Sequence, residues 1–177
     1  MISHSHEVAS KYSALASTGI LSLSPGSVNT IPGKVSFSLD IRSPKDSILD
    51  AIEAELRKDF AIMASRETTK GLDLAVSWTK DSDSPATHFH PDCISAVREA
   101  AVAVTGDESL VRDMVSGAGH DSVYASRRCP ASMIFVPSRG GVSHHPEEYT
   151  TPEDCAIGAE VLMQGVLRYD QLRDQTR

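Results

Sequence analysis

The stretch "KVSFSLDIRSPKD", residues 34–46, places a strand pattern directly before the start of a helix. Apolar and polar side chains alternate along its first part, which is the two-residue period of a strand with one buried face. Asp40 and Arg42 therefore lie side by side on the polar face. Ser43 is a suitable helix N-cap, and a proline and an aspartate follow it in the predicted first turn.

The residues on either side of this stretch extend the pattern into a small domain. The predicted helix carries one apolar face, made of Ile48, Ile52, Leu56, Phe60 and Met63. Residues 7–16 are interpreted as the end of a helix, residues 21–23 and 74–78 alternate like strands, and Pro32-Gly33 predicts a turn. Residues 1–84 are therefore predicted to form an α+β sandwich with an antiparallel sheet.

The pattern changes after a polar, proline-containing stretch, residues 81–92, which predicts a junction between domains. Asp92 is predicted to cap a helix that ends near Gly106. The apolar positions of this helix are Ile94, Val97, Ala101 and Val104. Residues 110–114 predict a short strand, and the "ASMIFVP" run at 131–137 predicts a strand buried on both faces of a parallel sheet.

The last predicted helix begins with Thr151 as its N-cap and a proline in its first turn. Its predicted buried face contains Ala159, Leu162, Met163, Val166 and Tyr169. Residues 85–177 hold too few predicted strands to close a sheet alone. This second part is therefore interpreted as the tail of an α/β domain.

Composition excludes several classes of partner. The net charge of −7 argues against general binding to nucleic acid or an anionic membrane, since both need clustered Lys and Arg. No apolar run has the length of a membrane-spanning helix, and the N-terminus does not have the pattern of a signal peptide. Cys93, Cys129 and Cys155 form no CxxC pair, so we interpret them as reduced thiols of a cytoplasmic protein.

Two glycine-containing loops are the main candidates for a functional site. "SGAGHDS", residues 116–122, and "SRGGVSHHPEE", residues 138–148, both follow predicted strands, and ligands of α/β sheets bind beyond the carboxyl ends of strands. His120 and His144 are therefore expected to converge, and imidazole suits zinc. Asp121 is a candidate second-shell carboxylate. The alternative is that these are loop histidines with ordinary hydrogen bonds.

A second candidate site flanks the predicted Pro-Gly turn, with Asn29 before it and Arg42 after it. Arg offers a planar fork that matches a carboxylate, and Asn could bind the same group or an amide. The alternative is a turn-forming Asn and a solvated Arg. The His-x-His pairs His4/His6 and His88/His90 are not expected to be ligand sets, because the first lies near a terminus and the second in the junction.

Three motifs together resemble the C-terminal half of the peptidase M20-like amidohydrolases. They are "SVNTIPGKVSFSLDIRSPKD", "MVSGAGHDSVYAS" and "CPASMIFVPSRGGVSHHPEEYT". The closest branch is the hydantoinase/carbamoylase group, which includes N-carbamoyl-L-amino-acid hydrolases, dizinc β-ureidopropionases and allantoate amidohydrolases. The resemblance covers residues 17–170.

The resemblance implies a two-domain architecture. Residues 1–84 correspond to an incomplete ferredoxin-like lid or dimerisation domain, and residues 85–177 to the C-terminal part of a zinc-exopeptidase-type α/β catalytic domain. The lid lacks its first strand, so the chain is expected to be the C-terminal portion of such an enzyme. A homodimer through the lid is also implied.

The resemblance makes His144 the zinc ligand contributed by the late loop. His145 stands where the family often has Asn, and Glu148 matches the acidic position of the loop. The family uses two zinc ions, with manganese possible, and its other metal ligands and its general base lie upstream of this chain. One ligand does not hold a pair of metal ions.

The substrate residues implied by the resemblance are His120, Asn29 and Arg42. His120 is expected to bind substrate or stabilise the tetrahedral intermediate, and Asn29 and Arg42 to hold the substrate carboxylate. The expected reaction is attack of a metal-activated water on the amide or ureido carbon of a small molecule. The alternatives are a non-catalytic dimerisation or interaction module, and an M20 aminopeptidase relative.

Overall fold

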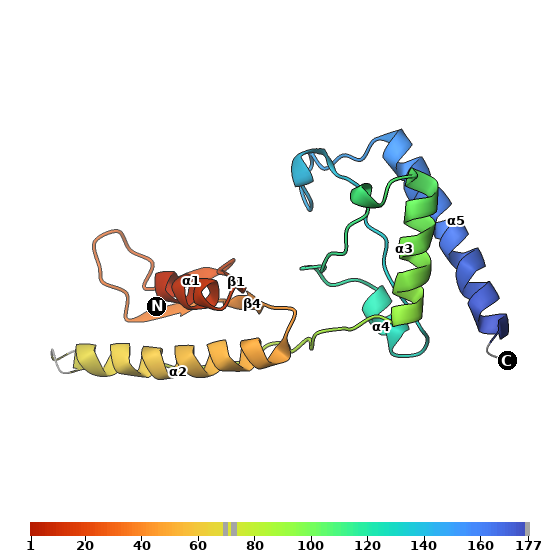
Figure 1. Ribbon diagram of the computed structural model, residues 1–177. Coiled ribbons are helices and arrows are strands. Elements are labelled where there is room, and N and C mark those ends of the chain that lie inside the picture. The colour runs from red at the N-terminus through yellow and green to blue at the C-terminus, as the bar shows by residue number, and fades with distance from the viewer. Residues whose placement is uncertain (69–70, 72–73, 176–177) are drawn as a thin grey trace. The chain divides into compact units, whose positions relative to one another are not determined.

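The computed structural model describes residues 1–68, 71 and 74–175. The chain forms two compact units, Met1–Ala86 and Thr87–Arg177, and each is described by itself (Figure 1). The division falls inside the polar stretch 81–92 that the sequence marks as a junction.

The first unit combines two helices with two small antiparallel sheets. Its elements are α1 (Ile2–Lys11), β1 (Leu15–Ser17), β2 (Leu21–Ser24), β3 (Lys34–Phe37), β4 (Asp40–Arg42) and α2 (Asp46–Thr68). The single strand predicted over residues 34–42 is two strands, because its two halves pair with different partners, β3 with β2 and β4 with β1. Ser38 lies at the break, where its hydroxyl accepts hydrogen bonds from the N–H groups of Gly19 and Ile20.

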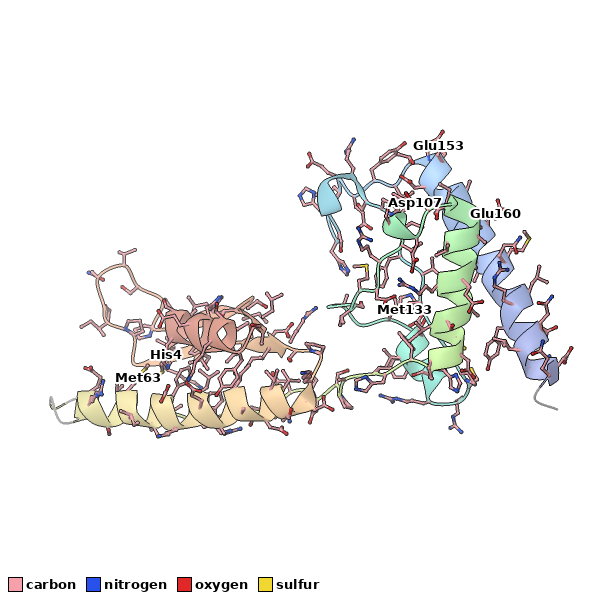
Figure 2. The ribbon with its side chains drawn as sticks, in the orientation of Figure 1. His4, Met63, Asp107, Met133, Glu153 and Glu160 are labelled. Atoms are coloured by element: carbon pink, nitrogen blue, oxygen red, sulfur yellow. The ribbon has the colours of Figure 1, made fainter. Side chains whose placement is uncertain are left out.

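The core of the first unit is built on the predicted face of α2. Ile52, Leu56 and Phe60 are at most 2% exposed, and Val8 of α1 packs with them. Figure 2 shows the side chain of Met63 on α2 near α1, and Met63 is one of the partly buried residues around this cluster. The apolar face predicted for α2 is therefore confirmed.

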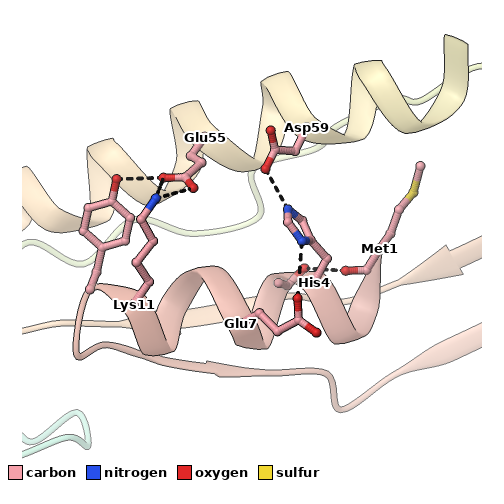
Figure 3. Close-up of polar contacts among 8 residues, drawn as sticks. Met1, His4, Glu7, Lys11, Glu55 and Asp59 are labelled. Carbon is pink, nitrogen blue, oxygen red and sulfur yellow. Dashed lines mark hydrogen bonds and ion pairs between the residues drawn. The ribbon is translucent and has the colours of Figure 1, made fainter. Parts of the chain in front are cut away.

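Polar contacts join both ends of α1 to α2 (Figure 3). Lys11 Nζ lies 2.8 Å from Glu55 Oε1, and the Tyr12 hydroxyl donates to Glu55 Oε2 at 2.7 Å. These donors lower the pKa of the Glu55 carboxyl, with Lys11 the larger cause. His4 Nε2 lies 2.6 Å from Asp59 Oδ2, so His4 joins two helices.

The strand predicted at residues 74–78 is absent from the part of the unit that the structure describes. The Trp78 ring instead stacks on the Phe60 ring, with 5.2 Å between the two ring centroids. The Arg57 guanidinium lies 4.8 Å from the centroid of the Trp78 ring. The other two residues of the alternating pattern, Leu74 and Val76, are exposed. No strand among the described residues offers this segment a ladder of hydrogen bonds.

The second unit is built on two long helices. Its elements are α3 (Pro91–Thr105), the 3-10 turn η1 (Glu108–Leu110), α4 (Ser122–Ser126), the 3-10 turn η2 (Arg139–Gly141) and α5 (Pro152–Gln175). Gly106 ends α3 in the left-handed conformation, and Thr151 Oγ1 caps α5 by accepting from Asp154 N at 3.0 Å, both as predicted. The predicted N-cap Asp92 is wrong: His90 occupies that position, and its Nδ1 accepts from Asp92 N at 3.3 Å.

The faces on which α3 and α5 pack differ from those predicted. The buried positions are occupied by small side chains or none, namely Cys93, Ala96 and Ala100 on α3 and Val161 and Gly165 on α5. A Cβ at Gly165 would lie 3.4 Å from Val97 Cγ2, so the glycine permits close approach of the two helices. The larger residues predicted to be buried, Leu162, Met163 and Val166, are each more than half exposed.

The two strands predicted in this unit, 110–114 and 131–137, are not formed among its described residues. The 131–137 segment lies against α3 instead: the Ala131 carbonyl accepts from His90 N at 3.0 Å, and Ser132 Oγ donates to the Cys93 carbonyl at 3.4 Å. A strand buried on both faces needs neighbouring strands to satisfy its backbone, and no described residues of this unit form one.

All three cysteines are free, and burial raises the pKa of the Cys93 thiol. No helix in the described ranges has the length and apolar content to cross a lipid bilayer.

Candidate functional site

The late loop, residues 138–149, is closed by its own backbone. Arg139 N donates to the Tyr149 carbonyl at 2.8 Å, which joins the two ends of the loop. Gly140 and Gly141 have φ angles of 65° and 68°, a conformation that glycine adopts without steric cost. These glycines turn the chain at η2 and lead into the two adjacent histidines.

His144 is one of two non-glycine residues with positive φ in the described part of the chain, at 57°. Its N–H donates to Glu148 Oε2 at 2.8 Å. Glu148 N in turn donates to the His145 carbonyl at 2.9 Å. The Glu148 residue therefore closes the turn around Pro146 with both its side chain and its backbone.

The three histidines of the two loops differ in their ring hydrogen bonds. Nδ1 of His120 accepts from Ser122 N at 3.0 Å, and Nδ1 of His145 accepts from Glu147 N at 3.2 Å. A ring whose Nδ1 accepts carries its proton on Nε2, so both residues present an N–H donor to their surroundings. The His144 ring has no hydrogen-bond partner among the described residues, which leaves both of its nitrogens open.

His144 is therefore the histidine of these loops that is best suited to bind a metal ion. Within residues 1–68, 71 and 74–175, however, no three His, Cys, Asp or Glu side chains come together as a metal site. These residues do not by themselves fit a metal ion, since a structural or catalytic site needs at least three protein ligands. Asp121 stands before α4 without a side-chain cap hydrogen bond, and its carboxylate forms no hydrogen bond with His120 or His144 in the described structure.

The predicted substrate residues of the first unit both already have polar partners. Arg42 forms a fork with Asp40, with Nη2 2.6 Å and Nε 3.1 Å from Oδ2. The Arg42 guanidinium lowers the pKa of the Asp40 carboxyl. Asn29 Oδ1 accepts from Ser27 Oγ at 2.8 Å in the exposed loop between β2 and β3. The contacts of the two residues are thus separate, and Arg42 must share or release Asp40 to take another carboxylate.

A surface pocket of about 370 Å³ lies at the start of α3, and none of its lining residues belongs to either loop. Its lining comprises His88, His90, Ser126, Arg127, Arg128, Cys129, Pro130 and Ala131. His90 of this His-x-His pair serves as the N-cap of α3, where its Nδ1 accepts from Asp92 N.

Sequence reasoning missed two partners that fix the loop histidines. Glu148 was noted only for its acidic character, and Ser122 was given no contact to His120. The signal for the Ser122 contact is local spacing, because the N–H two residues after His120, His145 and His90 binds the preceding ring in each case. The side chain of Glu148 instead accepts from the N–H four residues before it, that of His144. Such short-range side-chain to backbone bonds follow from the sequence once a loop is recognised.

Comparison with known proteins shows the family to which this chain of mixed helices and strands belongs. The sequence profile described as Peptidase family M20/M25/M40 matches residues 7–168. The chain therefore belongs to this family, as its three motifs predicted.

Relatives in the family are amidohydrolases of non-peptide C–N bonds. The chain is 34% identical over 157 residues to the N-carbamoyl-L-amino-acid amidohydrolase of Paenarthrobacter aurescens, covering 89% of this chain and 36% of that protein. It is 35% identical over 146 residues to the allantoate amidohydrolase of Bacillus subtilis strain 168, covering 81% and 33%. The crystal structure of a hydantoinase/carbamoylase family amidase from Burkholderia multivorans aligns with a TM-score of 0.79 at 34% identity, over 94% of this chain and 40% of that one. The chain thus spans about a third of the length of its curated relatives.

Proposed function

We propose that this chain forms the lid and the C-terminal part of the catalytic domain of a metal-dependent amidohydrolase, which hydrolyses N-carbamoyl amino acids or related ureido and amide compounds in the cytoplasm. The observation that carries the proposal is the open ring of His144 on a loop fixed from both ends. The family and the names of the relatives support the same reaction class.

The proposed metal centre is shared with residues that the relatives have and this chain does not span. His144 would contribute one imidazole to a pair of zinc or manganese ions. The described residues supply no second and third ligand beside it, so the proposal takes the remaining ligands and the general base from outside the described residues. Isolated, the chain is expected to retain no hydrolytic activity.

The substrate groups can be assigned from hydrogen-bonding capacity. His120 offers Nε2–H as a donor, which suits the negative oxygen of a tetrahedral intermediate or a polar substrate group. Arg42 has the fork needed for the carboxylate of an amino-acid product, and Asn29 offers an amide beside the same turn. In this assignment Asp40 keeps Arg42 oriented until substrate arrives.

The experiment that tests the proposal uses a chimera, in which residues 1–177 replace the matching segment of the Paenarthrobacter aurescens enzyme. We expect hydrolysis of N-carbamoyl amino acids by the chimera and its loss by at least about a thousandfold with His144→Ala, because a missing ligand opens the metal centre. His6→Ala is the matched control, since His6 is exposed in α1 and outside the proposed site. A profile of peptide substrates on the same chimera distinguishes an aminopeptidase.

Full activity of the His144→Ala chimera would contradict the proposal. Cleavage of dipeptides in preference to N-carbamoyl compounds would favour the aminopeptidase alternative.

A second candidate function is an interaction module that forms a dimer through the first unit. The observation that favours it is a set of apolar side chains exposed on the β2–β3 hairpin, Leu21, Leu23 and Val35, each about half exposed. Each sheet of this unit has two strands among the described residues, so strand edges are open to pairing there. Light scattering that gives a monodisperse monomer of the 177-residue chain would contradict this candidate.

A further inference from the structure

We infer that Glu148 is a positioning residue for His144: its carboxylate holds the backbone of His144 in the left-handed conformation from which the imidazole is presented with both nitrogens open. The inference rests on the proposed function, because the value of this positioning lies in the ligand role of His144. It assigns Glu148 a backbone contact and excludes it from the set of metal ligands.

The geometry of the turn supports this assignment. Left-handed backbone is uncommon for a residue with a side chain, and it persists where surrounding contacts hold it. At His144, with φ of 57°, the contact is the N–H to Glu148 Oε2 hydrogen bond of 2.8 Å. Glu148 N returns a bond of 2.9 Å to the His145 carbonyl, so the two ends of the turn are joined twice.

The neighbouring histidine provides an internal comparison. His145 is fixed through its ring, because Nδ1 accepts from Glu147 N at 3.2 Å. His144 is fixed through its backbone, and its ring makes no hydrogen bond to the residues that the structure describes. One histidine is thus oriented as a donor, while the other is held in place without occupying a ring nitrogen.

Replacing Glu148 by glutamine distinguishes a hydrogen-bonding role of this side chain from a role that needs its negative charge. Glu148→Gln keeps an oxygen that can accept the His144 N–H but removes the charge, whereas Glu148→Ala removes both. A positioning residue is therefore expected to tolerate Gln and not Ala. A metal ligand or general base at the same place would be damaged by both substitutions.

The first measurement uses the 177-residue chain and follows hydrogen exchange of the His144 amide by NMR. We expect exchange about three- to tenfold faster in Glu148→Ala, the size expected from loss of one exposed hydrogen bond, and little change in Glu148→Gln. Glu160→Gln on α5 is the matched control, since Glu160 is exposed and has no polar partner among the described residues. An unchanged rate in Glu148→Ala would overturn the inference.

The second measurement uses the chimera with the upstream part of the relative. Glu148→Ala is expected to lower kcat about ten- to a hundredfold, as is usual when a group that orients a metal ligand is removed, with KM nearly unchanged. Glu148→Gln is expected to retain most of kcat. Equal losses in the Gln and Ala variants would overturn the inference in favour of a charge-dependent role.

The two measurements also separate this inference from the proposed function. If the unmutated chimera fails to hydrolyse any carbamoyl compound, the proposed function is wrong, and the catalytic meaning of Glu148 falls with it. The amide exchange of His144 still decides whether Glu148 holds the turn.

Discussion

The two units of the chain bury very different kinds of residue. The first unit closes a core of large side chains, with Phe60, Ile52 and Leu56 at most 2% exposed. The second buries mainly small residues where α3 meets α5, and it leaves large apolar side chains such as Leu162 and Met163 more than half exposed. The helices of both units form from local signals, whereas within the described residues only the first unit supplies strands with partners.

Comparing the two units shows that an alternating or apolar pattern predicts a strand only where another strand lies within reach to pair with it. Residues 34–37 and 40–42 form strands because β2 and β1 lie within reach to pair with them. Residues 131–137 have a stronger apolar pattern but no such partner among the described residues. The backbone of this segment makes contacts outside a sheet, as where the Ala131 carbonyl accepts from His90 N at 3.0 Å, and a ladder of hydrogen bonds needs a neighbouring strand.

The largest expected effect is on the core of the first unit. Phe60→Ala should lower the free energy of unfolding by about 3–5 kcal/mol, because it removes a fully buried ring and leaves a cavity. Denaturant unfolding followed by the fluorescence of Trp78, the only tryptophan, measures it directly, since Trp78 stacks on Phe60. Leu21→Ala, at a side chain 56% exposed, is the control and should change stability by less than about 1 kcal/mol.

The second largest effect is expected where α3 packs on α5 at Gly165. Gly165→Leu should destabilise the contact between α3 and α5 by about 1–3 kcal/mol, because Val97 already lies against this position. Hydrogen exchange of the amides of both helices should become faster. Gly119→Leu, where an added Cβ meets nothing within 4 Å, is the matched control. Unchanged protection in α3 and α5 would show that the helices do not pack through Gly165.

A smaller effect is expected at the start of α5. Thr151→Ala should cost about 1 kcal/mol, because Thr151 Oγ1 satisfies the N–H of Asp154. Thr150→Ala removes the adjacent hydroxyl, which has no partner in the described structure, and serves as control. Thermal unfolding followed by circular dichroism compares them, and equal melting temperatures for the two variants would contradict the cap.

The smallest effect is a pH dependence of the first unit. The pKa of Glu55 is lowered in the folded chain by Lys11 and then by Tyr12, so this contribution to stability is present above the unfolded value of about 4.3 and is lost as pH falls through the folded value. Glu55→Gln should therefore flatten the acid side of the stability profile, measured by Trp78 fluorescence. Asp50→Asn on the same helix is the control, and an unchanged acid slope in Glu55→Gln would contradict the contact.

Local signals predicted much of the helical structure and little of the tertiary contacts. The apolar face of α2, the glycine end of α3 and the Thr151 cap depend on residues within a few positions of one another, and all three are confirmed. The packing face of α5 was predicted from its large residues. In the structure the buried residues of α5 are Val161 and Gly165, because the close approach of α3 at Val97 leaves little room for a side chain at Gly165.

In the candidate site, too, the sequence predicted individual residues but not the contacts between them. The sequence singled out His120 and His144, but the partners that set their rings and backbone, Ser122 and Glu148, emerged only with the loop geometry. The roles of all these residues in catalysis stay predictions, because a metal centre is defined by ligands that meet in space.

The measurement that tests the central claim most directly is the metal content of the chimera, by elemental mass spectrometry, with His144 present or replaced by alanine. The account predicts about two zinc or manganese ions per chain with His144 and a loss of about one or more in His144→Ala, because a dinuclear centre loses metal when a ligand is removed. His145→Ala should keep its metal, since its Nδ1 is already occupied. Equal metal content with and without His144 would contradict the claim that this residue is the ligand supplied by this chain.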